Sequence, residues 1–290
     1  MMRILFTGLF SLVLVQTVLA QDDLLNELDN KEPSDTELTI GTFNGTRMVN
    51  GHSTETLYRG SLEFIITHRF GTLNSGGYNL WGLDDASIRL GLEYGITDRL
   101  GVGLGRSSFD KTFDYYVKYK ALQQSKHMPI TLTALGTASY NASMNVEFPT
   151  LTTQEKMSYV AQFLISRKFS SRLSLQVAPV YLHQATVDQD IAVNDLFSVG
   201  FGGRMKVTKS MAIIGEYYLR VNENENTPYY DPIGVGVEFE TGGHVFQLVF
   251  TNSRGMVERS FLAETEGNFF KGDIHFGFNI TRTFQLARNK

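Results

Sequence analysis

A strict alternation of residue types runs through the stretch Ala86-Ser87-Ile88-Arg89-Leu90-Gly91-Leu92-Glu93-Tyr94-Gly95-Ile96. One set of alternate positions carries apolar and aromatic side chains, and the other set carries Ser, Arg, Gly and Glu. Because successive side chains of a β-strand point to opposite faces, this period of two predicts a strand with one apolar and one polar face. The stretch has about the 9 to 11 residues with which a tilted strand crosses the hydrocarbon of a membrane.

The same alternation recurs along most of the chain, and it predicts an all-β protein with about twelve strands. The predicted strands are 61–70, 85–96, 99–107, 111–122, 129–140, 157–169, 172–183, 196–207, 211–221, 233–241, 244–252 and 270–284. Most of them are longer than the strands of soluble sheets, which have about 5 to 6 residues. Strand length therefore favours a membrane protein.

Short and long connections alternate between these segments. The short ones are tight polar turns, namely Thr97-Asp98-Arg99, Ser170-Ser171-Arg172, Thr208-Lys209-Ser210, Thr241-Gly242-Gly243 and, more loosely, 125–128. The connections between them are longer, at 71–84, 141–156, 184–195, 222–232 and 253–269, with a short exception at 108–110. This asymmetry is typical of outer-membrane barrels, and an even strand number places both termini on the periplasmic side.

The apolar face of the strands must point either into a core or toward lipid. Eight strands already enclose a space that side chains fill, so we expect a twelve-stranded interior to be too wide for an apolar core. The sequence therefore predicts a transmembrane antiparallel β-barrel over residues 60–290 with outer-membrane lipid around it. Aromatic residues near the long-loop ends fit an interfacial girdle: Tyr78, Trp81, Tyr140, Tyr181, Tyr229, Tyr230, Phe269 and Phe270. A periplasmic β-sandwich is the alternative fold.

The N-terminal residues are of a different kind. Residues 1–20 carry Arg3, an apolar run and a small-residue end, which predict a cleavable signal peptide, export and a place in the outer membrane. Residues 21–59 are expected to form a periplasmic segment with a short helix in 22–32. This segment is a candidate plug of the barrel mouth, a free tail, or an arm that docks a periplasmic protein partner. No stretch after residue 20 is long and apolar enough for a membrane-spanning helix.

Charged residues repeat on the strand faces opposite the apolar ones, and they are the candidate lumen-lining residues. They are Glu63, Arg69, Arg89, Glu93, Asp114, Lys118, Lys120, Arg204, Glu216, Arg220, Glu238, Lys271, Asp273 and His275. Both signs of charge occur among them. Such a lumen is either a water-filled selective path or a network of ion pairs that closes the barrel.

Three glycines, Gly101, Gly103 and Gly105, fall on the lumen face of one predicted strand. Their lack of side chains leaves room for the long charged side chains of the neighbouring strands. The pattern fits a groove along one wall, or packing relief and strand curvature, which we favour.

Composition excludes several classes of function. The 290 residues include 26 basic and 30 acidic side chains, which give no electrostatic reason to expect nucleic acid as a partner. There is no Cys, so a thiol nucleophile is impossible. The acidic loop residues lack the ordered spacing of a calcium loop, and we expect no metal, no cofactor and no catalytic residue. A hydrolase embedded in the barrel is a less favoured alternative.

One part of the sequence also resembles a known family. The motifs are Asn50-Gly51-His52-Ser53-Thr54-Glu55, Thr67-His68-Arg69-Phe70-Gly71, Gly82-Leu83-Asp84, residues 88–107 and Lys118-Tyr119-Lys120. Together they resemble a family of Gram-negative outer-membrane β-barrels of unknown function. The resemblance implies the fold and the membrane, and it implies no activity, ligand or catalytic residue.

Two functions follow from these expectations. The first is a channel or transporter for a small solute, in which charged residues such as Arg89, Glu93, Lys118 and Lys120 set selectivity. The second is a structural or partner-binding barrel without transport.

Overall fold

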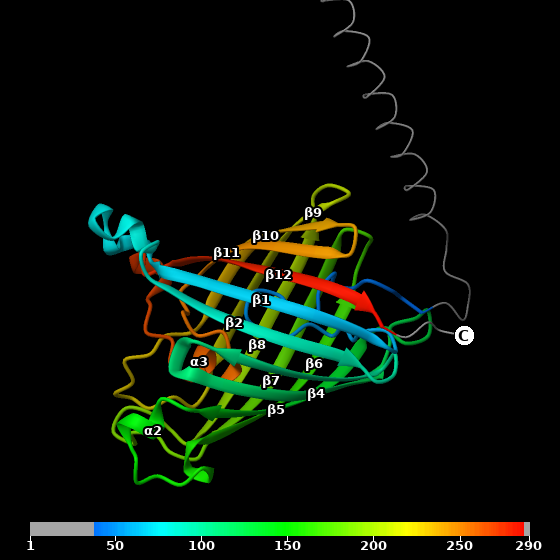
Figure 1. Ribbon diagram of the computed structural model, residues 1–290. Helices are drawn as coiled ribbons and strands as arrows, with labels where there is room; N and C mark the ends of the chain where they lie inside the picture. The colour runs from blue at the N-terminus through cyan, green and yellow to red at the C-terminus, as the bar shows by residue number, and fades with distance from the viewer. Residues whose placement is uncertain (1–37, 287–290) are drawn as a thin grey trace, which may run out of the picture.

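The computed structural model describes residues 38–286, and they form one closed antiparallel β-barrel of twelve strands (Figure 1). Each strand pairs with the next in sequence, and β1 pairs with β12 to close the barrel. The strands are β1 (Ser61–Thr72), β2 (Ala86–Gly95), β3 (Leu100–Ser107), β4 (Thr112–Leu122), β5 (Thr131–Asn141), β6 (Met157–Lys168), β7 (Leu173–Gln184), β8 (Asp195–Lys206), β9 (Met211–Arg220), β10 (Ile233–Thr241), β11 (His244–Thr251) and β12 (His275–Gln285). The predicted fold class is confirmed.

Helical elements are short and lie in the connections. They are η1 (Leu73–Ser75), η2 (Gly77–Gly82), η3 (Phe109–Lys111), α2 (Met144–Glu147), η4 (Gln154–Lys156), α3 (Glu258–Ala263) and η5 (Phe269–Lys271). Among the described residues, no helix has both the length and the apolar character needed to cross a bilayer.

The strand faces are inverted relative to a soluble protein. In β2, Leu90 is 45% exposed, while its neighbour Arg89 is fully buried. The same alternation of exposed apolar and buried polar residues runs along β4, whereas the buried face of β7 also carries Ala178, Val180 and Leu182. The apolar outer surface therefore suits lipid, and most of the inner surface is polar.

The connections follow the predicted asymmetry. Tight turns join β2 to β3, β6 to β7, β8 to β9 and β10 to β11, and we call their side of the barrel the short-turn end. The longer connections, including 142–156 and 252–274, lie at the opposite side, the long-loop end.

Strand β12 begins at His275 rather than at residue 270, which corrects two expected positions. Asn268 accepts hydrogen bonds from the backbone N–H groups of Phe270 and Lys271, and this cap starts the 3-10 turn η5. Gly272 then has a φ of 89°, a left-handed conformation that ends the turn. Lys271 is therefore exposed in η5 and Asp273 lies in the loop, so neither side chain lies on a strand.

Residues 42–55 enter the barrel interior from the short-turn end, and we call them the lumen hairpin (blue in Figure 1). The chain reverses where the N–H of Met48 donates to the carbonyl of Gly51 at 2.9 Å, and Arg47 pairs with His52 in an antiparallel bridge. The entry is fixed by a bridge between Leu38 and Ser125, which lies in the β4–β5 connection. The helix predicted in 22–32 and the signal peptide lie outside the described residues.

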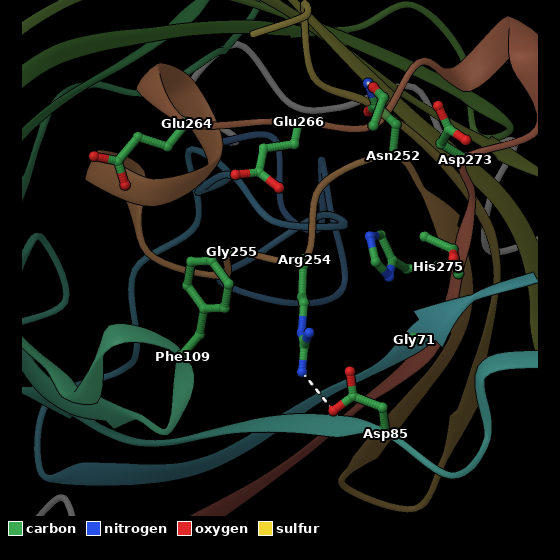
Figure 2. A pocket seen from close by; sticks show the side chains of 12 residues that line it. Gly71, Asp85, Phe109, Asn252, Arg254, Gly255, Glu264, Glu266, Asp273 and His275 are labelled. Carbon is green, nitrogen blue, oxygen red and sulfur yellow. Dashed lines mark hydrogen bonds and ion pairs between the residues drawn. The ribbon is translucent and has the colours of Figure 1, made fainter. Parts of the chain in front are cut away.

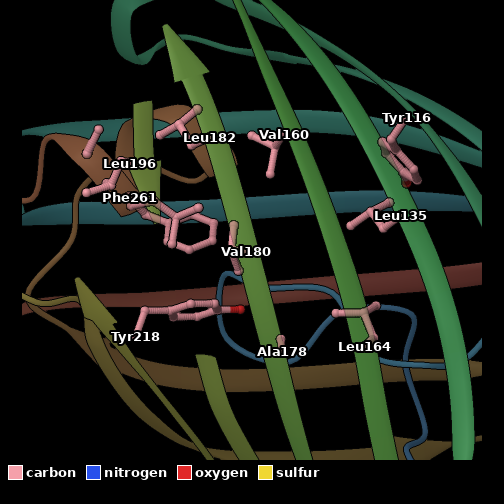
Figure 3. Packing of buried hydrophobic residues seen from close by; sticks show 12 residues of the cluster. Tyr116, Leu135, Val160, Leu164, Ala178, Val180, Leu182, Leu196, Tyr218 and Phe261 are labelled. Atoms are coloured by element: carbon pink, nitrogen blue, oxygen red, sulfur yellow. The ribbon is translucent and has the colours of Figure 1, made fainter. Parts of the chain in front are cut away.

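A second segment enters the interior from the long-loop end. All six residues of α3, in the β11–β12 loop, are buried. Phe261, Leu262 and Ala263 pack against an apolar part of the inner wall (Figure 3). That wall consists of Leu135, Val160, Leu164, Ala178, Val180, Leu182, Leu196 and Tyr218. The expectation that a twelve-stranded interior is too wide for apolar packing is wrong here, because α3 supplies the volume that the wall alone leaves open.

Candidate functional site

The inner wall carries most of the charged residues expected there. Twelve of the fourteen candidates are buried on strands, namely Glu63, Arg69, Arg89, Glu93, Asp114, Lys118, Lys120, Arg204, Glu216, Arg220, Glu238 and His275. The other two are the loop residues Lys271 and Asp273. The lumen hairpin brings several of the twelve together by binding them through its backbone.

Glu216 on β9 holds the tip of the lumen hairpin. Its carboxylate accepts hydrogen bonds from the backbone N–H groups of Val49 at 3.3 Å, Asn50 at 2.8 Å and Gly51 at 3.1 Å. A tight turn points these donors in one direction, and a carboxylate satisfies them with charge-assisted hydrogen bonds.

Arg69 on β1 binds the same tip through its acceptors. One guanidinium nitrogen donates to the Val49 carbonyl at 2.9 Å and to the Asn50 side-chain oxygen at 2.8 Å. The other donates to Asn279 on β12 at 2.9 Å. The tip is therefore held between a carboxylate of β9 and a guanidinium of β1.

A polar chain continues around the wall from Asn279. Its amide donates to Gln247 at 2.7 Å, and Gln247 donates to Glu238 at 3.0 Å. Arg204 completes the chain with a hydrogen bond of 2.9 Å to the other oxygen of Glu238. Buried charges paired in this way avoid the cost of an isolated ion in a low dielectric.

Strand β4 carries a second polar cluster. Asp114 accepts two hydrogen bonds from Arg89 of β2 in a side-on pair. The hydroxyl of Tyr116 donates to Glu93 at 3.0 Å. The ammonium of Lys118 lies 3.9 Å from Glu93 and donates to the hairpin carbonyls of Thr46 at 3.1 Å and Glu55 at 3.0 Å.

The glycines of β3 make this cluster possible. A Cβ at Gly103 would lie 2.1 Å from the Tyr116 ring, and one at Gly105 would lie 2.3 Å from the Arg89 guanidinium. These side chains therefore fill the space over β3. The contacts support packing relief rather than a groove.

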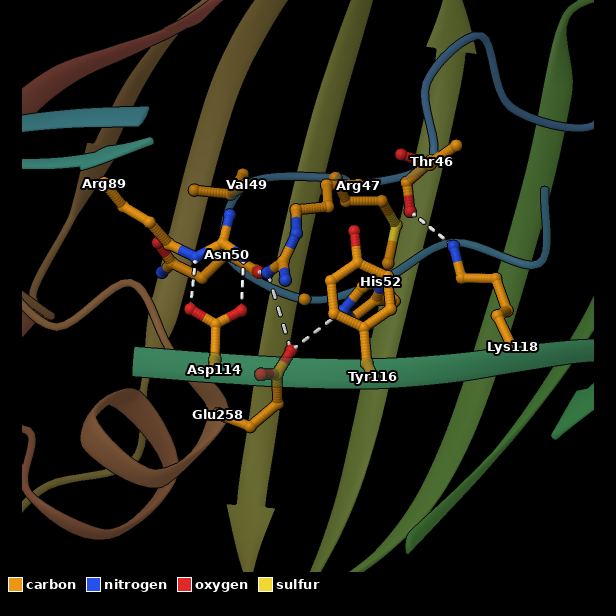
Figure 4. Close-up of polar contacts among 12 residues, drawn as sticks. Thr46, Arg47, Val49, Asn50, His52, Arg89, Asp114, Tyr116, Lys118 and Glu258 are labelled. Atoms are coloured by element: carbon orange, nitrogen blue, oxygen red, sulfur yellow. Dashed lines mark hydrogen bonds and ion pairs between the residues drawn. The ribbon is translucent and has the colours of Figure 1, made fainter. Parts of the chain in front are cut away.

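The lumen hairpin and α3 meet in the interior (Figure 4). Oε1 of Glu258, the first residue of α3, lies 3.2 Å from Nε2 of His52 and 3.5 Å from a guanidinium nitrogen of Arg47. The His52 ring also stands edge-on to Tyr116, with 4.6 Å between the ring centroids. Burial, and then the positive charges of Arg47, Lys118 and Arg89, hold the pKa of His52 well below its ordinary value.

Each end of the barrel contains a cavity. At the long-loop end, about 370 Å³ is lined by residues that include Asp85, Phe109, Arg254, Glu266 and His275 (Figure 2). Arg254 crosses this space to form a 2.6 Å ion pair with Asp85.

At the short-turn end, a cavity of about 590 Å³ is lined by residues that include Phe43, Glu55, Tyr58, Glu63 and Lys120. The lumen hairpin and α3 occupy the interior between the two mouths. In the part of the chain that the structure describes, no group of three or more metal-ligating side chains comes together.

Sequence reasoning missed Tyr116 and Glu258, whereas Arg47 and His52 lie in the N-terminal segment that was expected as a candidate plug. Tyr116 shares the face of β4 with Asp114 and Lys118, so strand alternation predicts that it faces the lumen. It was not among the candidates because only charged residues and His were selected. Arg47, His52 and Glu258 lie in segments without strand periodicity. Only the tertiary structure brings Glu258 to Arg47 and His52.

Comparison with solved structures gives barrels of low sequence similarity. A KdgM porin has 8% identity and a TM-score of 0.47, covering 76% of this chain and 99% of that chain. The COG4313 outer membrane channel from Pseudomonas putida F1 has 13% identity and a TM-score of 0.44, covering 80% and 98%. Omp33 from Acinetobacter baumannii has 10% identity and a TM-score of 0.41, covering 79% and 99%.

No curated protein matches the sequence. In contrast, one family matches most of the chain, over residues 43–284. The match includes the lumen hairpin from Phe43 onward and the loop that carries α3. It covers β1 to β11 in full and β12 up to Phe284. The chain therefore belongs to the family described as "Membrane bound beta barrel domain (DUF5777)".

Proposed function

We propose that this protein is an outer-membrane channel for a small polar or charged solute, and that its own lumen hairpin closes it at rest. The proposal is for a non-catalytic protein. The observation that carries it is the set of polar contacts that hold the hairpin to the wall, which outnumber the small apolar cluster of Val49, Ile214 and Val249. Glu216, Arg69 and Lys118 all bind backbone groups of the hairpin.

A polar contact of this kind can be exchanged for water. If the hairpin leaves, its N–H and C=O groups and the wall charges become hydrated, and the net cost of each lost hydrogen bond to a charged group is about 1.5–3 kcal/mol. Withdrawing an apolar segment would instead expose hydrophobic surface to water. The chemistry of the hairpin therefore suits a gate.

The emptied lumen would present charges of both signs on the strands that contact the hairpin. The apolar wall of β5 to β9 stays covered by α3 as long as that helix remains in place. Ionised groups that line such a path favour small hydrophilic solutes and set their charge selectivity.

A structural or partner-binding barrel is the second candidate, and the filling of the interior from both ends favours it. In that case the hairpin and α3 would be permanent parts of the core. Ion conduction separates the two functions, because a permanent core passes no current.

The test is conductance in planar bilayers. Wild type is compared with a variant lacking residues 42–55, a variant in which residues 256–265 are replaced by a Gly-Ser linker, and the combination. We expect wild type to be mostly closed and the combined variant to conduct steadily. In that open background, Lys118→Ala should reduce the preference for anions, because one fixed positive charge is lost.

Folding of each variant is verified by the difference in electrophoretic mobility between unboiled and boiled samples. Silent bilayers in every inserted and folded variant would reject the channel and favour the structural or partner-binding barrel.

A further inference from the structure

The lumen hairpin and α3 come from opposite ends of the barrel and are far apart in sequence, yet they share one buried contact. Glu258 is fully buried, and so is His52. Arg47, the third member, also donates a 2.9 Å hydrogen bond to the Asn50 carbonyl and so stabilises the tip of the hairpin. The contact with Glu258 therefore reaches the part of the hairpin that Glu216 and Arg69 hold.

The polar groups of this contact have few other partners. Among the described residues, no hydrogen bond is made by Oε2 of Glu258, by either ring nitrogen of His52, or by Nε and one terminal nitrogen of Arg47. Nε2 of His52 and Oε1 of Glu258 are close enough for an ion pair but do not form a hydrogen bond. If the hairpin withdrew alone, Glu258 would lose the Arg47 guanidinium and the neighbouring His52 ring, and only water entering the lumen could replace them. Breaking an ion pair that is buried in the closed state is unfavourable for both of its members.

A second, apolar link joins the same two segments through Tyr218 of β9. Its ring packs against Phe261 of α3, with 5.2 Å between the ring centroids. Its hydroxyl end lies against the hairpin tip, where a Cβ added to Gly51 would be only 1.8 Å away. Movement of α3 would therefore free the residue against which the tip is packed.

We infer that Glu258 is a positioning residue that couples the lumen hairpin to α3, so that displacement of either segment loosens the other. This inference deepens the proposed function, because it links the hairpin that closes the channel to an element from the opposite end of the barrel. The coupling is reciprocal: seating of the hairpin stabilises α3 by the same free energy by which seating of α3 stabilises the hairpin.

The absence of Cys from the chain allows a direct test with single thiol reporters. Val49→Cys places a thiol at the hairpin tip and Ser260→Cys places one in α3, and both parent side chains are buried. Each reporter is combined with Glu258→Gln, and the rate of maleimide labelling is measured on the folded, membrane-inserted protein. We expect labelling of both thiols to accelerate about fivefold or more, the range of typical coupling energies.

Two further variants complete the design. Glu216→Gln weakens only the wall contact of the hairpin, and it should nevertheless accelerate labelling of the thiol at position 260 in α3. Glu266→Gln is the matched control, because this exposed residue is in the same loop and makes no described contact with the hairpin. Its labelling rates should equal those of the parent.

The inference is overturned if Glu258→Gln accelerates only the thiol in α3 or neither thiol, or if Glu216→Gln accelerates only the thiol in the hairpin. Mobility on unboiled gels excludes variants that fail to fold. Labelling requires no ion flow, so the two experiments are independent. Bilayers without current would reject the channel but leave the coupling open. Labelling in which each thiol responds only to changes in its own segment would reject the coupling but leave the channel open.

Discussion

At the scale of single residues, His52 is a titratable group in a buried and mainly positive environment. The groups that face it come from every element around it: Arg47 in the hairpin, Arg89 on β2, Tyr116 and Lys118 on β4, and Glu258 on α3. Because its pKa is lowered well below 6.5, mainly by burial, His52 is neutral when the hairpin is seated.

The sign of the pH dependence follows from this shift. A withdrawn hairpin carries a hydrated His52 with an ordinary pKa of about 6.5. Just below that pH the withdrawn hairpin therefore binds a proton, whereas the seated hairpin does not. The stability of the seated state is therefore fully present above about pH 6.5 and falls with decreasing pH, by at most about 1.4 kcal/mol per pH unit.

We expect labelling of a Val49→Cys reporter to accelerate as the pH is lowered from 7.5 to 5.5. The acceleration is measured relative to the same reporter in a His52→Gln background. The ratio of the two rates removes the pH dependence of the maleimide reaction itself, because that dependence is common to both proteins. A ratio that stays constant across this range would contradict a role for His52 in seating the hairpin.

At the scale of elements, strand β3 shows how the inner wall accommodates large polar side chains. Gly103→Ala would place a Cβ against the Tyr116 ring, which Glu93 and His52 already hold in place. We expect a loss of about 1–3 kcal/mol in the free energy of unfolding, the usual cost of overpacking.

The measurement is urea unfolding in lipid vesicles, followed by gel mobility. Gly136→Ala on β5 is the matched control, because a Cβ there meets no atom within 4 Å. Its unfolding midpoint should stay the same or rise slightly, since alanine restricts the unfolded chain. Equal midpoints for the two variants would show that β3 needs no space over Gly103.

The strands could be predicted from the sequence because their signal is local. Alternation and turn residues occur within each segment, and the observed bounds agree with the predicted ones to within two residues except at the start of β12. There the cap at Asn268 and the left-handed Gly272 override a run of residues, from Phe270 to His275, that alternates in type. Local pattern could not show this competition.

The interior could be predicted only in part. Arg89 and Glu216 were found because strand alternation determines their direction. Their partners depend on contacts between residues distant in sequence, such as Glu216 with the tip at Asn50, and on the burial of Glu258. The Asn50-Gly51 pair did indicate a turn, but a turn signal does not say that the turn lies inside a barrel.

At the scale of the whole molecule, the asymmetry of the two ends suggests an orientation in the membrane. The lumen hairpin enters at the short-turn end, where β1 begins and β12 ends, so both ends of the described chain lie on one side (Figure 1). Outer-membrane barrels keep short turns in the periplasm and long loops outside the cell. We therefore expect the 142–156 and 252–274 loops to face the exterior.

Thiol reporters in intact cells test this orientation. Val146→Cys lies in the 142–156 loop, where Val146 is 81% exposed, and Ser210→Cys lies in the exposed β8–β9 turn. In a Gram-negative host, a maleimide that cannot cross the outer membrane should label position 146 in intact cells. It should label position 210 only after permeabilisation, because that turn would then face the periplasm. The reverse pattern would place the short turns outside, and with them the entrance of the lumen hairpin. Labelling of neither position before permeabilisation, with both labelled afterwards, would show that neither end of the barrel reaches the cell surface.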